Sequence, residues 1–219
     1  MKKLFCFMAV VGLFLTATAC SPKDNEPEDS QTEQPDDTTP KPQLTGKVLI
    51  VYYSFTNNVH TIISDLHTQI EADVLRVEPT EEGLDYAANN YAIGSALIAA
   101  IRNNPSDASS YPSIKTTISN LSDYGTIIVA TPLWWSNMAA PMQTFLFSYG
   151  TQMANKNIGL IVSSSSSGIS SVEADAKRLI PNGKFLSPSL WIRSSQTSDC
   201  HSMIAEWLNQ LEKSNTNVQ

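Results

Sequence analysis

The sequence predicts an α/β domain with an open parallel sheet and helices on both of its faces. Short runs of β-branched and apolar residues recur along residues 46–219, and stretches with helical hydrophobic spacing separate them. Strands that are covered on both faces have such continuous apolar runs. Strands that alternate with helices are joined by right-handed crossovers and therefore lie parallel. Five such strands fit one domain of this length.

The first half of the domain predicts two strands and two helices. Residues 47–53 (KVLIVYY) predict the first strand, and residues 73–77 (DVLRV) predict the second. Between them, apolar residues recur with the spacing of one helix face: Val59, Ile62, Ile63, Leu66 and Ile70. Residues 85–103 predict a longer helix, and a polar connection follows it.

The second half predicts three more strands, at residues 126–131, 158–162 and 185–192. Pro188 interrupts the last of these, which suits a strand at the edge of the sheet. Pro141 fits the first turn of a helix because its fixed φ suits that position. Further helices are expected over residues 172–179 and 199–211.

The segment before the domain has the composition of an export signal and a linker. Residues 1–19 begin with two lysines, continue with a short apolar run and end in small residues, as in a secretory signal peptide. Residues 20–45 are rich in Pro, Asp, Glu and Thr and cannot bury enough apolar surface to fold. We therefore expect a disordered acidic linker that acts as a tether.

Cys20 ends the sequence Ala17-Thr18-Ala19-Cys20, which resembles the lipidation motif of bacterial lipoproteins. The Leu that is usual three residues before the Cys is replaced by Ala17. The resemblance implies an exported lipoprotein of the cell envelope, anchored in the outer membrane, and the acidic start of the linker resembles signals for surface exposure. Ordinary cleavage before an unmodified Cys is the alternative.

Charge and cysteine content narrow the function classes. The formal net charge is −7, with −5 on the linker and −4 on the domain against +2 on the leader, and the domain has no cluster of Lys and Arg. This argues against nucleic acid as a partner. Cys6 lies in the leader and Cys20 is the expected lipid site, so the domain keeps only Cys200 and no disulfide. No later stretch is long enough to span a bilayer, so we expect membrane contact through the lipid alone.

Three loops follow predicted strands and meet at one edge of the sheet, where open parallel sheets bind ligands. The candidate residues are Ser54, Phe55, Thr56, Asn57, Asn58 and Val59, then Pro132, Leu133, Trp134 and Trp135, then Ser163, Ser164, Ser165, Ser166, Ser167 and Gly168. The first loop offers hydroxyl groups and the free N–H groups of a helix start, which can bind a phosphate through neutral donors. In the second, we expect one indole to face a flat ligand and the other to face the core.

These segments resemble the flavodoxin family over nearly all of residues 46–211. The sequence from Ser54 to Val59 is similar to the Ser/Thr-x-Thr-Gly-Asn-Thr phosphate loop, and residues 124–135 with Pro141 look like the Pro-x-Trp-Trp segment of a flavodoxin subfamily. The resemblance implies a flavodoxin-like sheet of strand order 2-1-3-4-5 and FMN bound non-covalently at the three loops. It also implies electron transfer with an unidentified redox partner, or FMN-dependent reduction.

The loops depart from the family pattern in three ways. Asn57 stands in place of Gly, and Asn tolerates a left-handed backbone better than most residues. Val59 replaces a Thr whose hydroxyl would meet the phosphate, a loss of about 1.5–3 kcal/mol, or about ten- to a hundredfold in affinity. In the third loop, serines replace most of the glycines, and their side chains either crowd the flavin ring or bond to it.

Two functions of other classes stay open. Val59 and the serine loop favour a binding or scaffolding lipoprotein that has the fold without the flavin. An enzyme that depends on Cys200 would need a reactive thiol in the first turn of the last helix, beside Asp199 and His201. The fold alone does not choose among these functions.

Overall fold

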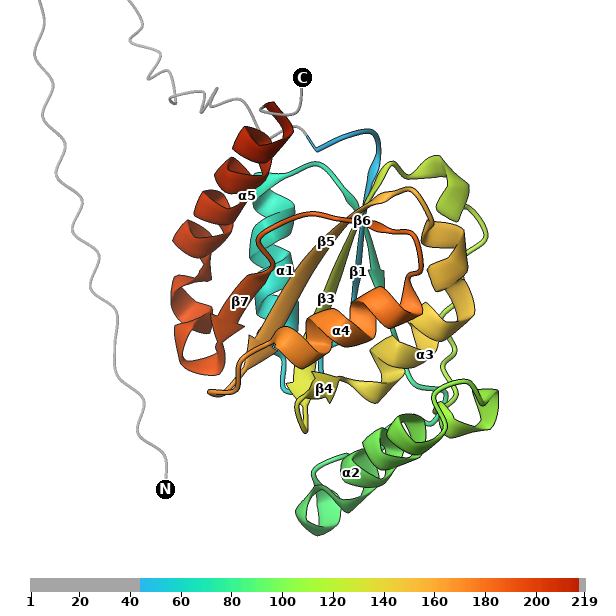
Figure 1. Ribbon diagram of the computed structural model, residues 1–219. Coiled ribbons are helices and arrows are strands. Elements are labelled where there is room, and N and C mark those ends of the chain that lie inside the picture. Colours follow the sequence, from blue (N-terminus) through green and yellow to red (C-terminus); the bar gives the residue numbers. More distant parts are fainter. Residues whose placement is uncertain (1–43, 217–219) are drawn as a thin grey trace, which may run out of the picture. The chain divides into compact units, whose positions relative to one another are not determined.

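The structure, a computed structural model, describes residues 44–216 and their side chains as far as Leu211. The expected leader, Cys20 and residues 20–43 of the expected linker lie outside the described residues. No helix in the described range is long and apolar enough to cross a membrane. The described residues form the α/β domain that the sequence predicts (Figure 1).

Strands and helices alternate along the domain. The strands are β1 (Val48–Tyr52), β2 (Asp73–Arg76), β3 (Thr126–Trp134), β4 (Asn137–Met138), β5 (Asn157–Ser164), β6 (Lys184–Phe185) and β7 (Leu190–Arg193). The α-helices are α1 (Asn58–Gln69), α2 (Ala88–Asn103), α3 (Ala140–Tyr149), α4 (Ser170–Leu179) and α5 (Cys200–Thr216). Short 3-10 helices are η1 (Ala108–Ser110), η2 (Leu121–Asp123), η3 (Gly150–Met153) and η4 (Ser194–Asp199).

The sheet has the parallel topology expected from the sequence. Its strand order is β2-β1-β3-β5-β6. Strand β6 pairs with the start of β5, and β7 pairs with the remainder of β5 further along the same strand. All of these pairings are parallel, and only β4 runs antiparallel, as a hairpin with β3. Counting β6 and β7 as one position, this is the order 2-1-3-4-5. The strand order reverses between β1 and β3, so their carboxyl ends mark the expected ligand edge.

Each face of the sheet is covered by its own set of helices. Side chains of β1 alternate between the faces, so that Leu49 and Val51 pack with α3 and α4 while Val48 and Ile50 pack with α1 and α5. The two helix layers lie on opposite sides of the strands in Figure 1. Because both faces are buried, β1 is buried at every residue, which explains its continuous apolar sequence.

The third and the fifth expected strands differ most from their expected boundaries. The third strand was expected to end at Pro132, but β3 continues to Trp134 because β4 folds back and pairs with it. Pro132 lacks an N–H but its carbonyl accepts a hydrogen bond from the N–H of Ala139 at 3.2 Å. The fifth strand is split into β6 and β7, with Pro188 between them.

Helix α2 begins later than the hydrophobic pattern suggests. Residues Asn89, Asn90 and Tyr91 have φ values of 51°, 57° and 62°, so the first turn is left-handed and a kink separates it from the rest. Residues with a Cβ rarely adopt this backbone, although Asn does so more readily than most. The regular part of α2 lies next to α3 and the end of β3, and Ile98 and Ile101 bury there.

The close approach of α3 and α4 predicts a position that cannot accept a side chain. A Cβ at Gly150 would lie 1.9 Å from the carbonyl oxygen of Leu179, so Gly150→Ala must push the two segments apart. Because Gly150 has an ordinary helical backbone, the cost is steric, and we expect a loss of about 1–3 kcal/mol in the free energy of unfolding. Urea denaturation measures it. Gly168→Ala is the control, because nothing lies within 4 Å of its Cβ, and equal stability losses would contradict the packing.

Candidate functional site

A cavity of about 350 Å³ lies at the carboxyl ends of β1, β3 and β5. The three candidate loops and two further segments line it: Ser54, Phe55, Thr56, Asn58, Val59, Tyr86, Tyr91, Pro132, Leu133, Trp134, Trp135, Ser163, Ser164, Ser165 and Ser194. The structure thus brings the three loops together around one space. Four candidate residues are outside this lining: Asn57, Ser166, Ser167 and Gly168.

Sequence reasoning missed three lining residues, Tyr86, Tyr91 and Ser194. The two tyrosines precede or begin the regular part of α2, a region that the sequence pattern treats as an ordinary helix. Ser194 follows β7, so the rule that ligands bind after the strands of a parallel sheet, applied to the fifth strand, would have found it. No comparable signal marks the tyrosines, because the sequence pattern does not reveal the left-handed turn at residues 89–91.

The first loop ends at the start of α1, where two backbone N–H groups have no acceptor among the described residues. Asn57 precedes α1 with φ 68° in the left-handed region, as its place in the loop suggested, and its side chain makes no capping hydrogen bond. The N–H of His60 donates to the Ser54 hydroxyl at 3.1 Å, and the Asn58 side chain donates to the Thr56 hydroxyl at 3.3 Å. The N–H groups of Asn58 and Val59 have no acceptor in the described part of the chain. Such a helix start favours an anion.

Val59 belongs both to the hydrophobic core and to the cavity wall. Its side chain is 1% exposed and packs with Ile62 and Ile63 of α1 against the sheet, while it also borders the cavity. It is therefore an apolar part of the cavity wall where the family pattern has a hydroxyl. Phe55 also borders the cavity, and it makes edge-to-face contacts with Tyr86 and Trp134.

The two tryptophans of the second loop face different surroundings, as expected. Trp134 is 9% exposed and lies among Tyr53, Phe55 and Tyr86, with ring centroids 4.9–6.1 Å away. Trp135 is 41% exposed and meets the Trp134 ring edge to face. Trp134 thus belongs to the core beneath the cavity, and Trp135 forms an open wall.

Helix α2 supports the outer tryptophan. A Cβ at Gly94 would lie 2.9 Å from two ring atoms of Trp135, so the indole rests directly on the helix backbone. The Tyr91 ring meets it at 6.3 Å with an interplanar angle of 74°, and Tyr91 is itself half exposed. Tyr91 and Trp135 therefore form one aromatic rim at the mouth of the cavity.

Only the first three residues of the serine loop, Ser163 to Ser165, line the cavity. Ser163 and Ser164 are buried, and the Ser164 hydroxyl donates to the Ser167 carbonyl at 2.8 Å and accepts from the Trp191 indole at 2.9 Å. These bonds fix the loop on itself. Ser165 borders the cavity and is exposed. The end of the loop is outside the lining.

The electrostatics of the site are neutral. The lining has no charged side chain, and the Arg76 guanidinium donates to the Ser54 carbonyl at 3.4 Å from outside the lining. Burial raises the pKa of the Tyr53 and Tyr86 hydroxyls, so both stay protonated at neutral pH. No metal-binding cluster of His, Cys, Asp or Glu occurs among the residues that the structure describes. The lining therefore offers hydroxyl, amide and aromatic groups to a ligand.

Cys200 does not have the surroundings of a reactive thiol. It is 3% exposed within the hydrophobic cluster under α5, and burial raises its pKa, whereas a nucleophilic cysteine needs a lowered one. His201 instead contacts the carboxylate of Asp65 at 3.1 Å. The structure therefore argues against an enzyme that depends on Cys200.

Comparison with known proteins supports the fold and the family. Residues 47–211 match the sequence profile of the flavodoxin family. A solved structure provisionally classed as a flavoprotein, from Bacteroides uniformis, is 19% identical, with a TM-score of 0.57 over 73% of this chain and 98% of that one. A flavoprotein from Lactobacillus acidophilus in complex with FMN is 18% identical, with a TM-score of 0.56 over 72% and 99% of the two chains. No curated protein sequence matches significantly.

The left-handed backbone at Asn57 predicts which replacements the first loop tolerates. At φ 68° a Cβ is strained, and Asn57→Ala loses the tolerance that Asn has. We expect Asn57→Ala to lower the free energy of unfolding by about 1 kcal/mol, while Asn57→Gly leaves it unchanged or raises it. Urea denaturation of both variants measures this, and an alanine variant as stable as the glycine variant would contradict the assigned backbone.

Proposed function

Because the chain belongs to the flavodoxin family, we propose that the cavity binds FMN non-covalently and that the protein transfers electrons. One observation carries the proposal: the free helix start of α1 and the open indole of Trp135 border the same cavity. These are the two kinds of group that a flavin mononucleotide requires, a donor set for its phosphate and a flat apolar wall for its ring.

The first loop fits the phosphate without a charged partner. The free N–H groups of Asn58 and Val59 and the hydroxyls of Ser54 and Thr56 are neutral donors near the positive end of the α1 dipole. The uncapped Asn57 side chain leaves this helix start open to a ligand. Val59 supplies only its backbone N–H, so the phosphate site has one hydroxyl fewer than the family pattern.

The aromatic rim fits the ring system. Trp135 is rigidly backed by α2 and by Trp134, so its exposed face is already ordered for a planar ligand. Bound FMN would supply the one- and two-electron redox chemistry. The neutral lining then sets the electrostatic surroundings of the ring. Electron transfer to a partner protein and reduction of a small substrate both remain compatible with a site whose rim is open.

The competing function is a lipoprotein that keeps this fold and binds no flavin. Val59 and the serine loop are the features that favour it. In the structure, however, the Ser164 hydroxyl already has its partners, and only the first part of the loop reaches the cavity. The loop therefore closes on itself and leaves the cavity open, which weakens the argument that serines crowd out a flavin.

We also propose that Cys20 carries a lipid and that the acidic linker tethers the domain to the cell envelope. The sequence before Cys20 supports lipidation, and the low apolar content of the linker supports a tether. An FMN domain on such a tether would meet its redox partner at or near the membrane. The anchor and the location are inferred from the sequence alone.

FMN binding is tested by titrating the purified protein and following flavin fluorescence. We expect saturable binding that Thr56→Ala weakens by about tenfold, as for one lost hydrogen bond to a charged group. Trp135→Ala should weaken it by a similar factor of about ten through lost ring contact. Thr117→Ala is the control, because this exposed threonine borders a different cavity. A folded protein that binds no FMN at millimolar concentration would leave the flavin-free function.

Lipidation is tested by detergent-phase partitioning of the full chain expressed in a bacterium that lipidates its exported proteins. We expect the unsubstituted protein to enter the detergent phase and Cys20→Ser to remain in the aqueous phase, because acyl chains drive the partitioning. Cys6→Ser is the matched control and should partition like the unsubstituted protein. Equal partitioning of the two serine variants would exclude Cys20 as the anchor.

A further inference from the structure

The turn that carries Trp135 has an unfavourable backbone for its sequence. Trp134 pairs with Asn137 across the β3–β4 hairpin, which leaves Trp135 and Ser136 as a two-residue loop. Their φ values are 47° and 64°, so both central residues are left-handed. Turns of this type favour Asn-Gly or Gly-Gly, and a bulky residue with positive φ is a marked outlier. Something outside the turn must hold it in this shape.

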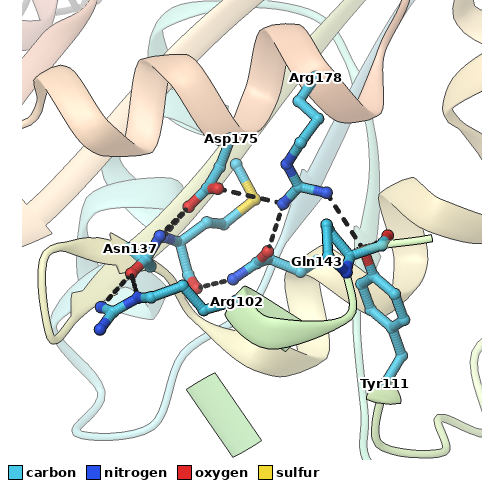
Figure 2. A network of polar contacts seen from close by, with 8 residues as sticks. Arg102, Tyr111, Asn137, Gln143, Asp175 and Arg178 are labelled. Carbon is cyan, nitrogen blue, oxygen red and sulfur yellow. Dashed lines mark hydrogen bonds and ion pairs between the residues drawn. The ribbon is translucent and has the colours of Figure 1, made fainter. Parts of the chain in front are cut away.

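Arg102 of α2 makes the contacts that hold the turn. Its Nη2 donates to the Trp135 carbonyl at 2.8 Å. Its Nε and Nη2 also donate to the Asn137 side-chain oxygen at 3.2 and 2.5 Å (Figure 2). The guanidinium therefore spans the turn from its first central residue to the residue that closes it. Among the described residues, Arg102 forms no ion pair, so its charge is directed at these acceptors alone.

Asp175 of α4 fixes the other side of Asn137. Its carboxylate accepts from the Asn137 amide at 2.9 Å, from the Met138 N–H at 3.0 Å and from Arg178 at 3.1 Å (Figure 2). Asp175 is 7% exposed, and these donors compensate its buried charge. Asn137 can therefore turn only one way, with its oxygen toward Arg102 and its nitrogen toward Asp175.

The network continues into the scaffold on the far side of Asp175. Arg178 also donates to the Gln143 side chain at 2.9 Å, and Gln143 donates to the Met138 carbonyl at 2.7 Å. Tyr111 accepts from Arg178 at 3.2 Å (Figure 2). The hairpin is thus bonded to α2, α3 and α4 together. A neighbouring cavity of about 230 Å³ is lined by apolar residues and by Arg102, Asn137, Gln143, Asp175 and Arg178. None of Arg102, Asn137 and Asp175 borders the FMN cavity.

We propose that Arg102, Asn137 and Asp175 are positioning residues that hold the strained Trp135–Ser136 turn, and so place the Trp135 indole for FMN binding. This rests on the proposed function, because the ligand of the indole is FMN. The residues act through the backbone of the turn and not by contact with the cofactor. Arg102 bonds directly to the carbonyl of the exposed Trp135, and Asp175 orients the Asn137 side chain that Arg102 also contacts.

The test combines loss of the Arg102 hydrogen bonds with relief of the backbone strain in the Trp135–Ser136 turn. Arg102→Met removes the hydrogen bonds that Arg102 donates to the turn, and Arg102 itself is exposed. We expect FMN affinity to fall about ten- to a hundredfold. Ser136→Gly in that background should restore most of the affinity, because Gly adopts the left-handed backbone without strain. Ser136→Gly alone should change affinity by less than about threefold. Lys177→Met is the matched control for lost charge, because Lys177 is exposed on α4 outside the network.

Other results would overturn the proposal. Unchanged affinity in Arg102→Met, or a loss that Ser136→Gly does not restore, would show that the network does not act through the turn. Arg102→Lys, which keeps the charge and one donor group, is the second variant if Arg102→Met fails to fold, and it should give a smaller loss that Ser136→Gly again restores. An unsubstituted protein that binds no FMN would instead overturn the proposed function.

A readout without FMN separates these two failures. The indole N–H of Trp135, identified by Trp135→Phe, gives one signal in a ¹H–¹⁵N NMR spectrum of the apo protein. We expect this signal to move or broaden in Arg102→Met and to return in the double variant with Ser136→Gly. A signal that stays in place in Arg102→Met would show that the network does not position the indole, whatever the result with FMN.

Discussion

The parallel pairing of β3 between β1 and β5 is the constraint on which the rest of the structure depends. It requires three central strands that are covered on both faces, and so it explains why their sequences are continuously apolar and why helices alternate with them. It also sends every connection after these strands to the same edge of the sheet. Loops that are far apart in the sequence therefore meet there, with backbone groups that the sheet no longer pairs.

Those unpaired groups give the edge its chemistry. At the start of α1, Asn58 and Val59 line the cavity, and the residues that line it with them are uncharged. A phosphate can be recognised there by dipoles alone, which keeps the surroundings of a redox ring free of fixed charges. Charged side chains lie outside the cavity lining, where Arg102 and Asp175 bond to the backbone and side chains of the β3–β4 hairpin.

The sequence allowed the parallel sheet and the three loops to be predicted, because apolar runs and loop positions are local signals. The strand order was expected only from the resemblance to the flavodoxin family. Asn57 could be assigned to a left-handed backbone because its residue type tolerates it. The β3–β4 hairpin, the kink before the regular part of α2 and the role of Tyr91 could not be predicted, because Trp135-Ser136 and Asn90-Tyr91 have no turn signature of their own. Tertiary bonds from Arg102 and packing against Gly94 decide the positions of these segments, and neither contact leaves a periodic pattern.

The distribution of backbone strain supports a functional edge independently of the family. Within residues 44–216, eight residues other than glycine have positive φ, and six of them lie in segments around the cavity: Asn57, Asn89, Asn90, Tyr91, Trp135 and Ser136. The remaining two, Asn155 and Asn182, lie elsewhere and are joined by a backbone hydrogen bond of 2.8 Å. Strain of this kind persists only where the surrounding structure maintains it. At three positions around the cavity the residue is Asn, which tolerates a left-handed backbone. Trp135 has no such tolerance and carries the largest side chain, so the hydrogen bond from Arg102 to its carbonyl is needed most there.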